Sequence, residues 1–114
     1  MTEVLDYLDD IIDAARKIRQ YINGMEYEEF SNDERTADAV LRNFQVIGEA
    51  TKVIPDDFYR EYDDVPWSEM AGMRDKLVHG YATIDLRIVW ATAQEEIPVV
   101  LSRVRAIRDE LETD

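Results

Sequence analysis

The chain has 114 residues, 46% of them hydrophobic, which indicates one folded globular domain spanning residues 1–114. It contains no cysteine, which excludes disulfides, thiolate zinc sites and a cysteine nucleophile, and no apolar run of the ~20 residues needed to span a membrane, so we expect a cytoplasmic protein. Its 26 acidic residues outnumber its 13 basic residues, and a net charge of −13 argues against a protein that coats nucleic acids by neutralising phosphates.

The first predicted element is an amphipathic helix from Glu3 to about Ile22. Its apolar residues recur at spacings of three and four, with charged residues between them. Asn23 and Gly24 then supply a stop signal, because either residue can adopt the left-handed conformation that ends a helix. The apolar residues are Val4, Leu8, Ile11, Ala15, Ile18 and Ile22.

A second helix is predicted from Ser31 to the residues before Pro55. Ser31 is followed three residues later by Glu34, which is the pattern of a capping box. Gly48 lies on the apolar face, where its missing side chain would let another helix approach closely. This face consists of Ala37, Leu41, Phe44, Gly48 and Thr51.

Residues 55–65 are predicted to form a connection that can hold a short turn of helix. A third helix follows from Pro66 to His79. Proline suits the first helical position, because the N–H it lacks would have no partner there. Gly80 is expected to end this helix.

The fourth predicted helix begins at Asp85, a good N-cap, and ends near Leu111. Pro98 lies inside it and is expected to kink it, because proline removes a backbone donor and crowds the preceding turn. Together these segments predict an all-α fold, an antiparallel bundle of four main helices. The apolar band of the last helix consists of Leu86, Val89, Trp90, Ala93, Ile97, Val100, Val104, Ile107 and Leu111.

Residues that can carry chemistry concentrate in the third helix. On a helical wheel, an apolar stripe surrounds Arg74. Burying an unpaired guanidinium is unfavourable, so this side chain must reach solvent, pair with a carboxylate, or face a cleft or a partner subunit. The stripe consists of Trp67, Met70, Leu77 and Val78.

His79, the only histidine, lies five residues after Arg74 at the end of the same helix. An imidazole that titrates near neutrality and a fixed cation are the groups that metal-independent RNA cleavage needs. From the residues alone the structural alternative stays open, in which His79 caps the helix and Arg74 pairs with Glu49 or Asp75. A single histidine cannot build a zinc site, and we predict no metal and no cofactor.

Three separated segments resemble one protein family. Residues 73–81 resemble the Arg-x4-His-x-Tyr motif of HepT toxins, a branch of the HEPN superfamily. Residues 41–50 resemble the second-helix segment of the same family, and the pairs Pro66-Trp67 and Val89-Trp90 also fit. The motif residues are Arg74, His79 and Tyr81.

The resemblance implies a HEPN-like helical bundle and a homodimer in which two motifs form a composite ribonuclease site. Arg74 and His79 would be the catalytic residues of a metal-independent endoribonuclease toxin that cleaves tRNA or mRNA. The resemblance also implies a partner, a minimal nucleotidyltransferase antitoxin, which transfers AMP onto Tyr81 and thereby blocks RNA. From the residues alone, Tyr81 can equally be a packed aromatic side chain.

Five further residues are candidates for lining the cleft, where Glu49 could orient Arg74 or His79. A solvated helix face is the alternative interpretation. The acidic composition is compatible with RNA if the cytoplasm is rich in salt or if RNA docks in a locally basic cleft. A second functional class also stays open, a non-catalytic HEPN module whose helices bind a nucleotidyltransferase or another protein. The five candidates are Asp75, Lys76, Arg42, Gln45 and Glu49.

Overall fold

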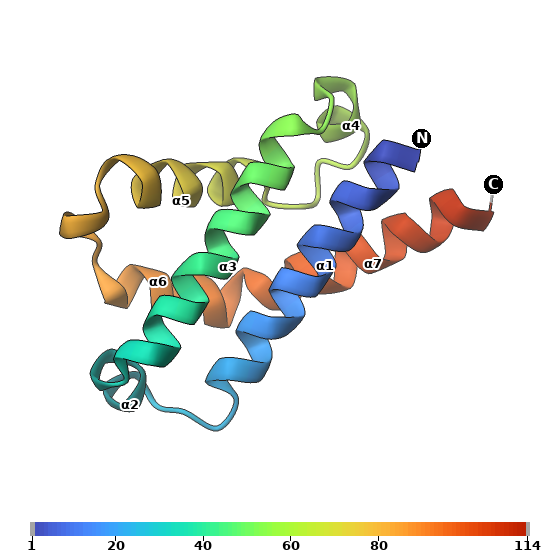
Figure 1. The fold of residues 1–114 in the computed structure, drawn as a ribbon. Helices are drawn as coiled ribbons and strands as arrows, with labels where there is room; N and C mark the ends of the chain where they lie inside the picture. Colours follow the sequence, from blue (N-terminus) through green and yellow to red (C-terminus); the bar gives the residue numbers. More distant parts are fainter. Residues whose placement is uncertain (1, 114) are drawn as a thin grey trace.

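The computed structural model describes residues 2–113, apart from the side chains of Thr2 and Tyr81. Over this range it is built from α-helices and one turn of 3-10 helix, and the predicted all-α bundle is confirmed (Figure 1). The short helix foreseen within residues 55–65 is also present, as α4. The elements are α1 (Thr2–Ile22), α2 (Tyr27–Asn32), α3 (Glu34–Val53), α4 (Asp56–Glu61), α5 (Trp67–His79), η1 (Tyr81–Thr83), α6 (Leu86–Glu95) and α7 (Ile97–Thr113).

Three helix pairs make the main contacts of the bundle: α1 with α3, α3 with α5, and α1 with α7. The helices α1 and α3 lie side by side and run in opposite directions, and α5 lies against the C-terminal half of α3 (Figure 1). Because α7 returns along α1, the two ends of the chain lie at the same end of the bundle. This arrangement places the motif helix α5 at the edge of the bundle, where one side of it stays open.

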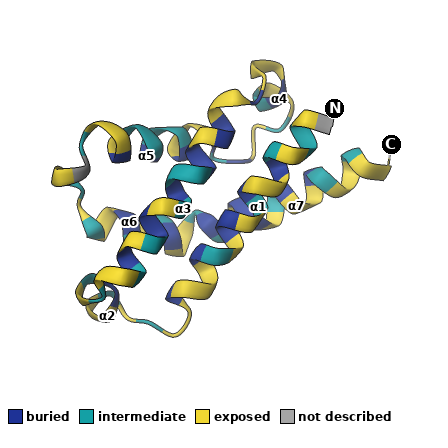
Figure 2. Ribbon diagram, viewed as in Figure 1, coloured by how far each residue is buried: buried dark blue, intermediate teal, exposed yellow. Residues whose placement is uncertain are grey.

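The hydrophobic core lies between α1, α3 and α7, where the buried faces of these helices meet (Figure 2). Leu8 and Ile11 of α1, Phe44 of α3 and Val104 of α7 have no or almost no exposed surface. Burial of such side chains is the main favourable term in folding, at about 1.5–3 kcal/mol for each large residue. The apolar spacings in the sequence therefore predicted the core faces of these helices correctly.

The predicted start of the second helix is wrong. Ser31 lies in α2, and its hydroxyl donates to the carbonyl oxygen of Glu28 at 3.1 Å instead of capping a new helix. Asp33 is the N-cap of α3, and its carboxylate accepts a hydrogen bond from the N–H of Thr36 at 3.1 Å. The sequence pattern beginning at Ser31 failed because a separate short helix already contains that residue.

Pro66 and Pro98 both lie where the sequence predicted that a proline would shape a helix. Pro66 is the N-cap of α5 and not its first helical residue. In the last helix α6 and α7 meet at Glu96, which keeps helical dihedral angles and whose N–H still donates to the carbonyl oxygen of Thr92 at 2.9 Å, so the junction is the kink that was predicted. The physical cause is the one foreseen, because Pro98 has no N–H to offer to the preceding turn and its ring crowds that turn.

Two predicted helix signals are confirmed. Gly24 has a φ of 79°, in the left-handed region that glycine adopts without strain, and it follows the end of α1. Asp85 is the N-cap of α6, and its carboxylate accepts from the N–H of Arg87 at 2.9 Å. In the described part of the chain, no helix is long and apolar enough to cross a membrane.

Candidate active site

The motif helix α5 is held against α3 at Gly48. A Cβ atom built on Gly48 would lie 2.1 Å from Cβ of Arg74 and 2.9 Å from the carbonyl oxygen of Met70. Only a residue without a side chain permits this approach, so the prediction that Gly48 serves helix packing is confirmed. The contact fixes the backbone of α5 directly beneath Arg74.

The buried face of α5 differs in one position from the predicted stripe. Trp67, Met70 and Leu77 are buried as expected, whereas Val78 is 43% exposed. Met73 takes the place assigned to Val78, with 6% of its surface exposed. The helical wheel placed Val78 on the buried face because the predicted apolar stripe was too wide. The helix α5 packs mainly against α3 and therefore buries a narrower face.

Arg74 lies at the border between this packed face and the surface. Its side chain is 25% exposed, with the aliphatic part over Gly48 and the guanidinium reaching outward. Nη1 pairs with Oδ1 of Asp75 at 3.2 Å, while Nε is buried and makes no hydrogen bond within the described residues. Of the situations foreseen for this arginine, the structure shows two, a route to solvent and a carboxylate partner.

His79 is the last residue of α5 and is exposed. Gly80 ends the helix there, and its N–H donates to the carbonyl oxygen of Lys76 at 2.8 Å. Five residues along a helix correspond to a rotation of about 140° and a rise of about 7.5 Å. No hydrogen bond or ion pair joins Arg74 and His79 in residues 2–113.

Tyr81 begins the 3-10 turn η1, directly after the end of α5. The backbone of this turn is closed by a hydrogen bond from the N–H of Thr83 to the carbonyl oxygen of Gly80 at 2.9 Å. The predicted role of Tyr81 concerns its side chain, which lies outside the described residues.

The structure adds a residue that the sequence interpretation missed. Lys52 near the end of α3 donates from Nζ to Oδ1 of Asp75 at 2.6 Å. The hydrogen bonds from Lys52 and then from Arg74 hold the pKa of the Asp75 carboxyl below its usual value of 3.8. A signal was present in the sequence, since Lys52 follows Gly48 by four residues and must lie on the same side of α3.

The candidates Arg42, Gln45 and Glu49 lie on α3 and form no hydrogen bond or ion pair with Arg74 or His79 among the described residues. Nε2 of Gln45 donates to Oε1 of Glu49 at 3.2 Å, and both Arg42 and Glu49 are exposed. No hydrogen bond or ion pair joins Glu49 to Arg74 or His79 among the described residues, which fits the alternative of a solvated face. The role of Glu49 in orienting the motif stays a prediction.

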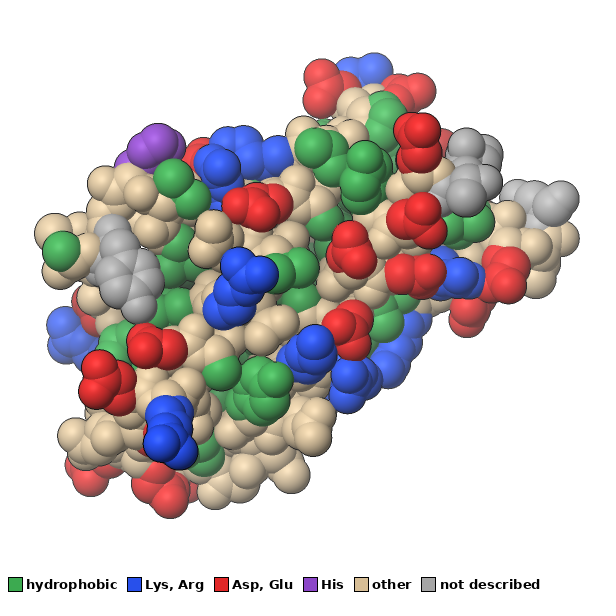
Figure 3. Space-filling view, in the orientation of Figure 1, with side chains coloured by type: hydrophobic (Ala, Val, Ile, Leu, Met, Phe, Trp, Pro, Cys, Tyr) green, Lys and Arg blue, Asp and Glu red, His purple; other side chains and the backbone are tan. Residues whose placement is uncertain are grey.

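Lys76 is exposed on α5 and borders a small cavity of about 310 Å³ next to Gly80 and Ile88. A larger cavity of about 750 Å³ is lined by residues of α3, α4, α5 and α7, among them Lys52, Tyr59 and Trp67, and not by Arg74 or His79. In Figure 3 the histidine projects from the surface over α5, with basic side chains beside it. Arg74 and His79 therefore line neither of these two cavities.

Comparison with known proteins gives a consistent result. The family model for HepT-like ribonucleases matches residues 11–107. A probable ribonuclease HepT of Thermococcus cleftensis is 43% identical over 103 residues, which covers 90% of this chain and 94% of that protein. A putative RNase of Methanocaldococcus jannaschii is 43% identical over 110 residues, covering 96% of this chain and 85% of that protein.

A putative RNase of the bacterium Caldanaerobacter subterraneus is 38% identical over 101 residues, which covers 89% of this chain and 90% of that protein. No solved structure gives a significant match. The similarity to these proteins extends over nearly the whole chain and includes α5 with both motif residues.

Proposed function

The chain belongs to the HepT-like ribonuclease family, and from this premise we propose that it is an endoribonuclease toxin that cleaves tRNA or mRNA without a metal ion. The family match across residues 11–107 carries this proposal. The position of Arg74 and His79 on the open side of α5 supports it, because both can reach a bound RNA there.

Each motif residue has a separate chemical task in the proposed reaction. The imidazole of His79 moves a proton, either from the attacking 2′-hydroxyl or onto the leaving oxygen. The guanidinium of Arg74 binds the phosphate and stabilises the negative charge that builds up on its oxygens during the reaction.

A homodimer is the assembly that we propose for this reaction. The side chains of Arg74 and His79 leave α5 in directions about 140° apart, which supports a site where the arginine of one copy and the histidine of another act on the same phosphate. The exposed Val78 lies beside His79 and offers apolar surface that a second copy could cover. A two-fold axis near α5 would then create two equivalent composite sites.

The proposed regulation uses Tyr81. A minimal nucleotidyltransferase antitoxin would transfer AMP from ATP to the hydroxyl of this residue. Tyr81 lies two residues beyond His79, at the start of η1, so an attached nucleotide would stand next to the site. Its bulk would exclude RNA, and its phosphate would add negative charge that repels the substrate.

The catalytic part is tested by RNA cleavage in EDTA, at high KCl because salt screens the acidic surface. We expect Arg74→Ala and His79→Ala each to lose activity by about 100-fold or more. Arg16→Ala is the matched control, since Arg16 on α1 is an exposed arginine that pairs with a nearby aspartate at 2.9 Å. Full activity in both motif variants would favour the non-catalytic helical module instead.

The regulatory part is tested by intact-mass measurement after incubation with ATP and the antitoxin. We expect the mass of one or more AMP groups on the wild type and none on Tyr81→Phe. Tyr21→Phe removes an exposed tyrosine of α1 and should still be modified. Modification that persists in Tyr81→Phe would mean that another residue is the acceptor.

A further inference from the structure

Two cations from different helices meet at one oxygen atom beside the motif. Nζ of Lys52 on α3 and Nη1 of Arg74 on α5 lie 2.6 Å and 3.2 Å from the same Oδ1 of Asp75. The two nitrogens therefore lie close enough together for a single anionic group to contact both. In a chain with a net charge of −13, this is a locally basic position.

This cation pair is fixed relative to the catalytic histidine. Gly48 sets the distance between α3 and α5, and Lys52 lies one helical turn beyond it on the same side of α3. Asp75 precedes His79 by four residues, which places the two side chains one turn apart on one face of α5, with their Cβ atoms about 5–6 Å apart. An anion held by Lys52 and Arg74 would thus lie within reach of the proposed ribonuclease site.

We propose that Lys52 is a second phosphate-binding residue of this ribonuclease and that Asp75 occupies the phosphate position until RNA displaces it. The inference rests on the proposed function and adds a substrate contact from α3. The carboxylate of Asp75 stands where an oxygen of an RNA phosphate would lie, since both groups accept charge-assisted hydrogen bonds from the same donors.

Three features of the cluster support an exchange of anions. The side chains of Lys52 and Asp75 are 42% and 46% exposed, so RNA can approach them, and exposed ion pairs contribute little stability that would resist displacement. Nη1 of Arg74 has a single partner, Asp75, and the buried Nε has none in the described residues, so no other carboxylate holds the guanidinium in place. The carboxylate of Asp75, whose pKa is lowered by the same two cations, is charged at neutral pH and there competes with phosphate.

The alternative is that the pair of Lys52 and Asp75 only fastens α3 to α5. In that situation Lys52→Gln and Asp75→Asn would act alike, because both remove the same ion pair. The proposal predicts opposite effects on RNA binding. Lys52→Gln removes a phosphate contact and weakens binding, whereas Asp75→Asn removes the competing anion, leaves both cations in place and strengthens binding.

The experiment measures the dissociation constant of a short single-stranded RNA that is fully 2′-O-methylated and cannot be cleaved through the 2′-hydroxyl. We expect Lys52→Gln to weaken binding and to reduce the slope of log affinity against log KCl by about 0.7, the value for one phosphate contact with a single strand. Asp75→Asn should bind more tightly than wild type. Lys17→Gln is the matched control, since this exposed lysine of α1 pairs with Asp13 at 3.1 Å, and it should bind like wild type.

Cleavage of unmodified RNA by the wild type is measured in parallel, and thermal unfolding shows that each variant is folded. If the wild type cleaves RNA but Lys52→Gln binds with the affinity and salt slope of Lys17→Gln, the role of Lys52 is refuted while the ribonuclease stands. Weaker binding by both Lys52→Gln and Asp75→Asn also refutes it. A wild type that neither binds nor cleaves RNA overturns the ribonuclease assignment, and this inference with it.

Discussion

At the scale of residues, Arg74 shows what a helical wheel drawn for one helix can predict about a side chain and what it cannot. An arginine within an apolar stripe predicted a side chain with a special environment, and the structure places its stem over Gly48 and its guanidinium against Asp75. The wheel could not predict that Lys52 meets the same carboxylate. That contact depends on the register between α3 and α5, which only the close approach at Gly48 determines.

The pKa of Asp75 depends directly on its contacts with Lys52 and Arg74. The hydrogen bonds from Lys52 and then from Arg74 lower it below 3.8. A carboxyl group whose pKa is lowered by folding stabilises the fold above its unfolded pKa, and this contribution is lost as the pH falls through the lowered pKa. Asp75 thus contributes at neutral pH and stops contributing only in acid, below its usual titration range.

We therefore predict that an NMR titration places the pKa of Asp75 below 3.8 in the wild type and raises it towards that value in Lys52→Gln. Lys17→Gln should leave the pKa of Asp75 unchanged, because Lys17 lies on α1 and pairs with Asp13. An Asp75 that titrates at the same pH in all three proteins would contradict the contact between α3 and α5.

At the scale of elements, apolar spacing located the main helices well, while their ends depended on neighbouring elements. The capping signal at Ser31 did not mark the start of α3, because Ser31 belongs to α2 and the N-cap of α3 is Asp33. The junction at Glu96 is a similar example, because Pro98 predicted a kink in the last helix but not how large the kink would be. Whether a proline kinks or divides a helix depends on how the two parts pack.

The N-cap of α3 gives a prediction at this scale. Asp33→Ala removes the carboxylate that accepts from the N–H of Thr36, and we expect it to lower the free energy of unfolding by about 1 kcal/mol. Ser31→Ala is the control, because its hydroxyl bonds only to a carbonyl within α2, and a much smaller loss is expected. Denaturant unfolding of both variants checks this, and a larger loss in Ser31→Ala would restore the capping box that the sequence suggested.

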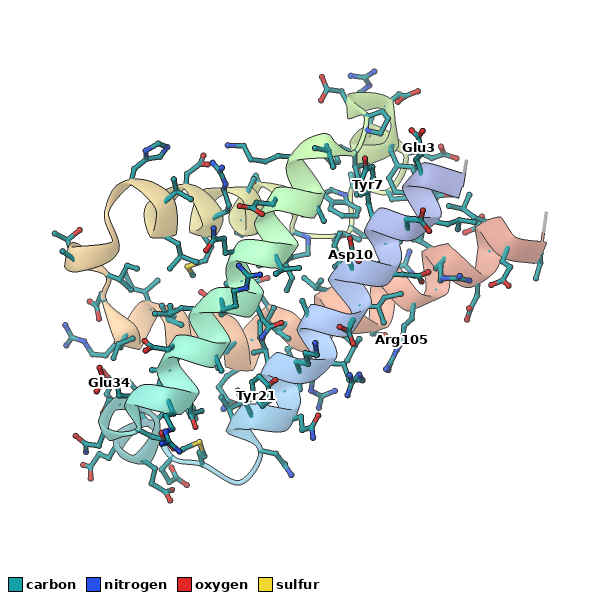
Figure 4. All side chains as sticks on the ribbon, viewed as in Figure 1. Glu3, Tyr7, Asp10, Tyr21, Glu34 and Arg105 are labelled. Carbon is teal, nitrogen blue, oxygen red and sulfur yellow. The ribbon has the colours of Figure 1, made fainter. Side chains whose placement is uncertain are left out.

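The whole molecule combines an acidic surface with a function that requires RNA. Figure 4 shows Glu3 and Asp10 along α1, on the far side of α3 from the motif helix, and both are exposed. A net charge of −13 opposes the approach of RNA at low salt, whereas Lys52 and Arg74 concentrate positive charge beside His79. Binding is then expected to be local, at α5, and not spread over the surface.

The arrangement of the active residues also belongs to this scale. The sequence predicted the pair Arg74 and His79 and, through the family resemblance, a site shared by two copies; within one chain the two residues diverge around α5. Their spacing of five residues makes this unavoidable in a regular helix, because successive residues rotate by about 100°. If both residues act on one phosphate, we propose that the site is shared between two copies of the chain.

Mixing two inactive variants tests this most directly. Arg74→Ala and His79→Ala are combined, allowed to exchange subunits, and assayed for RNA cleavage in EDTA, with native mass spectrometry to count mixed dimers. Random exchange gives half mixed dimers, each with one intact composite site, so we predict recovery of about a quarter of the wild-type activity. If mixed dimers form and the mixture cleaves no faster than either variant alone, the residues do not act across the subunits.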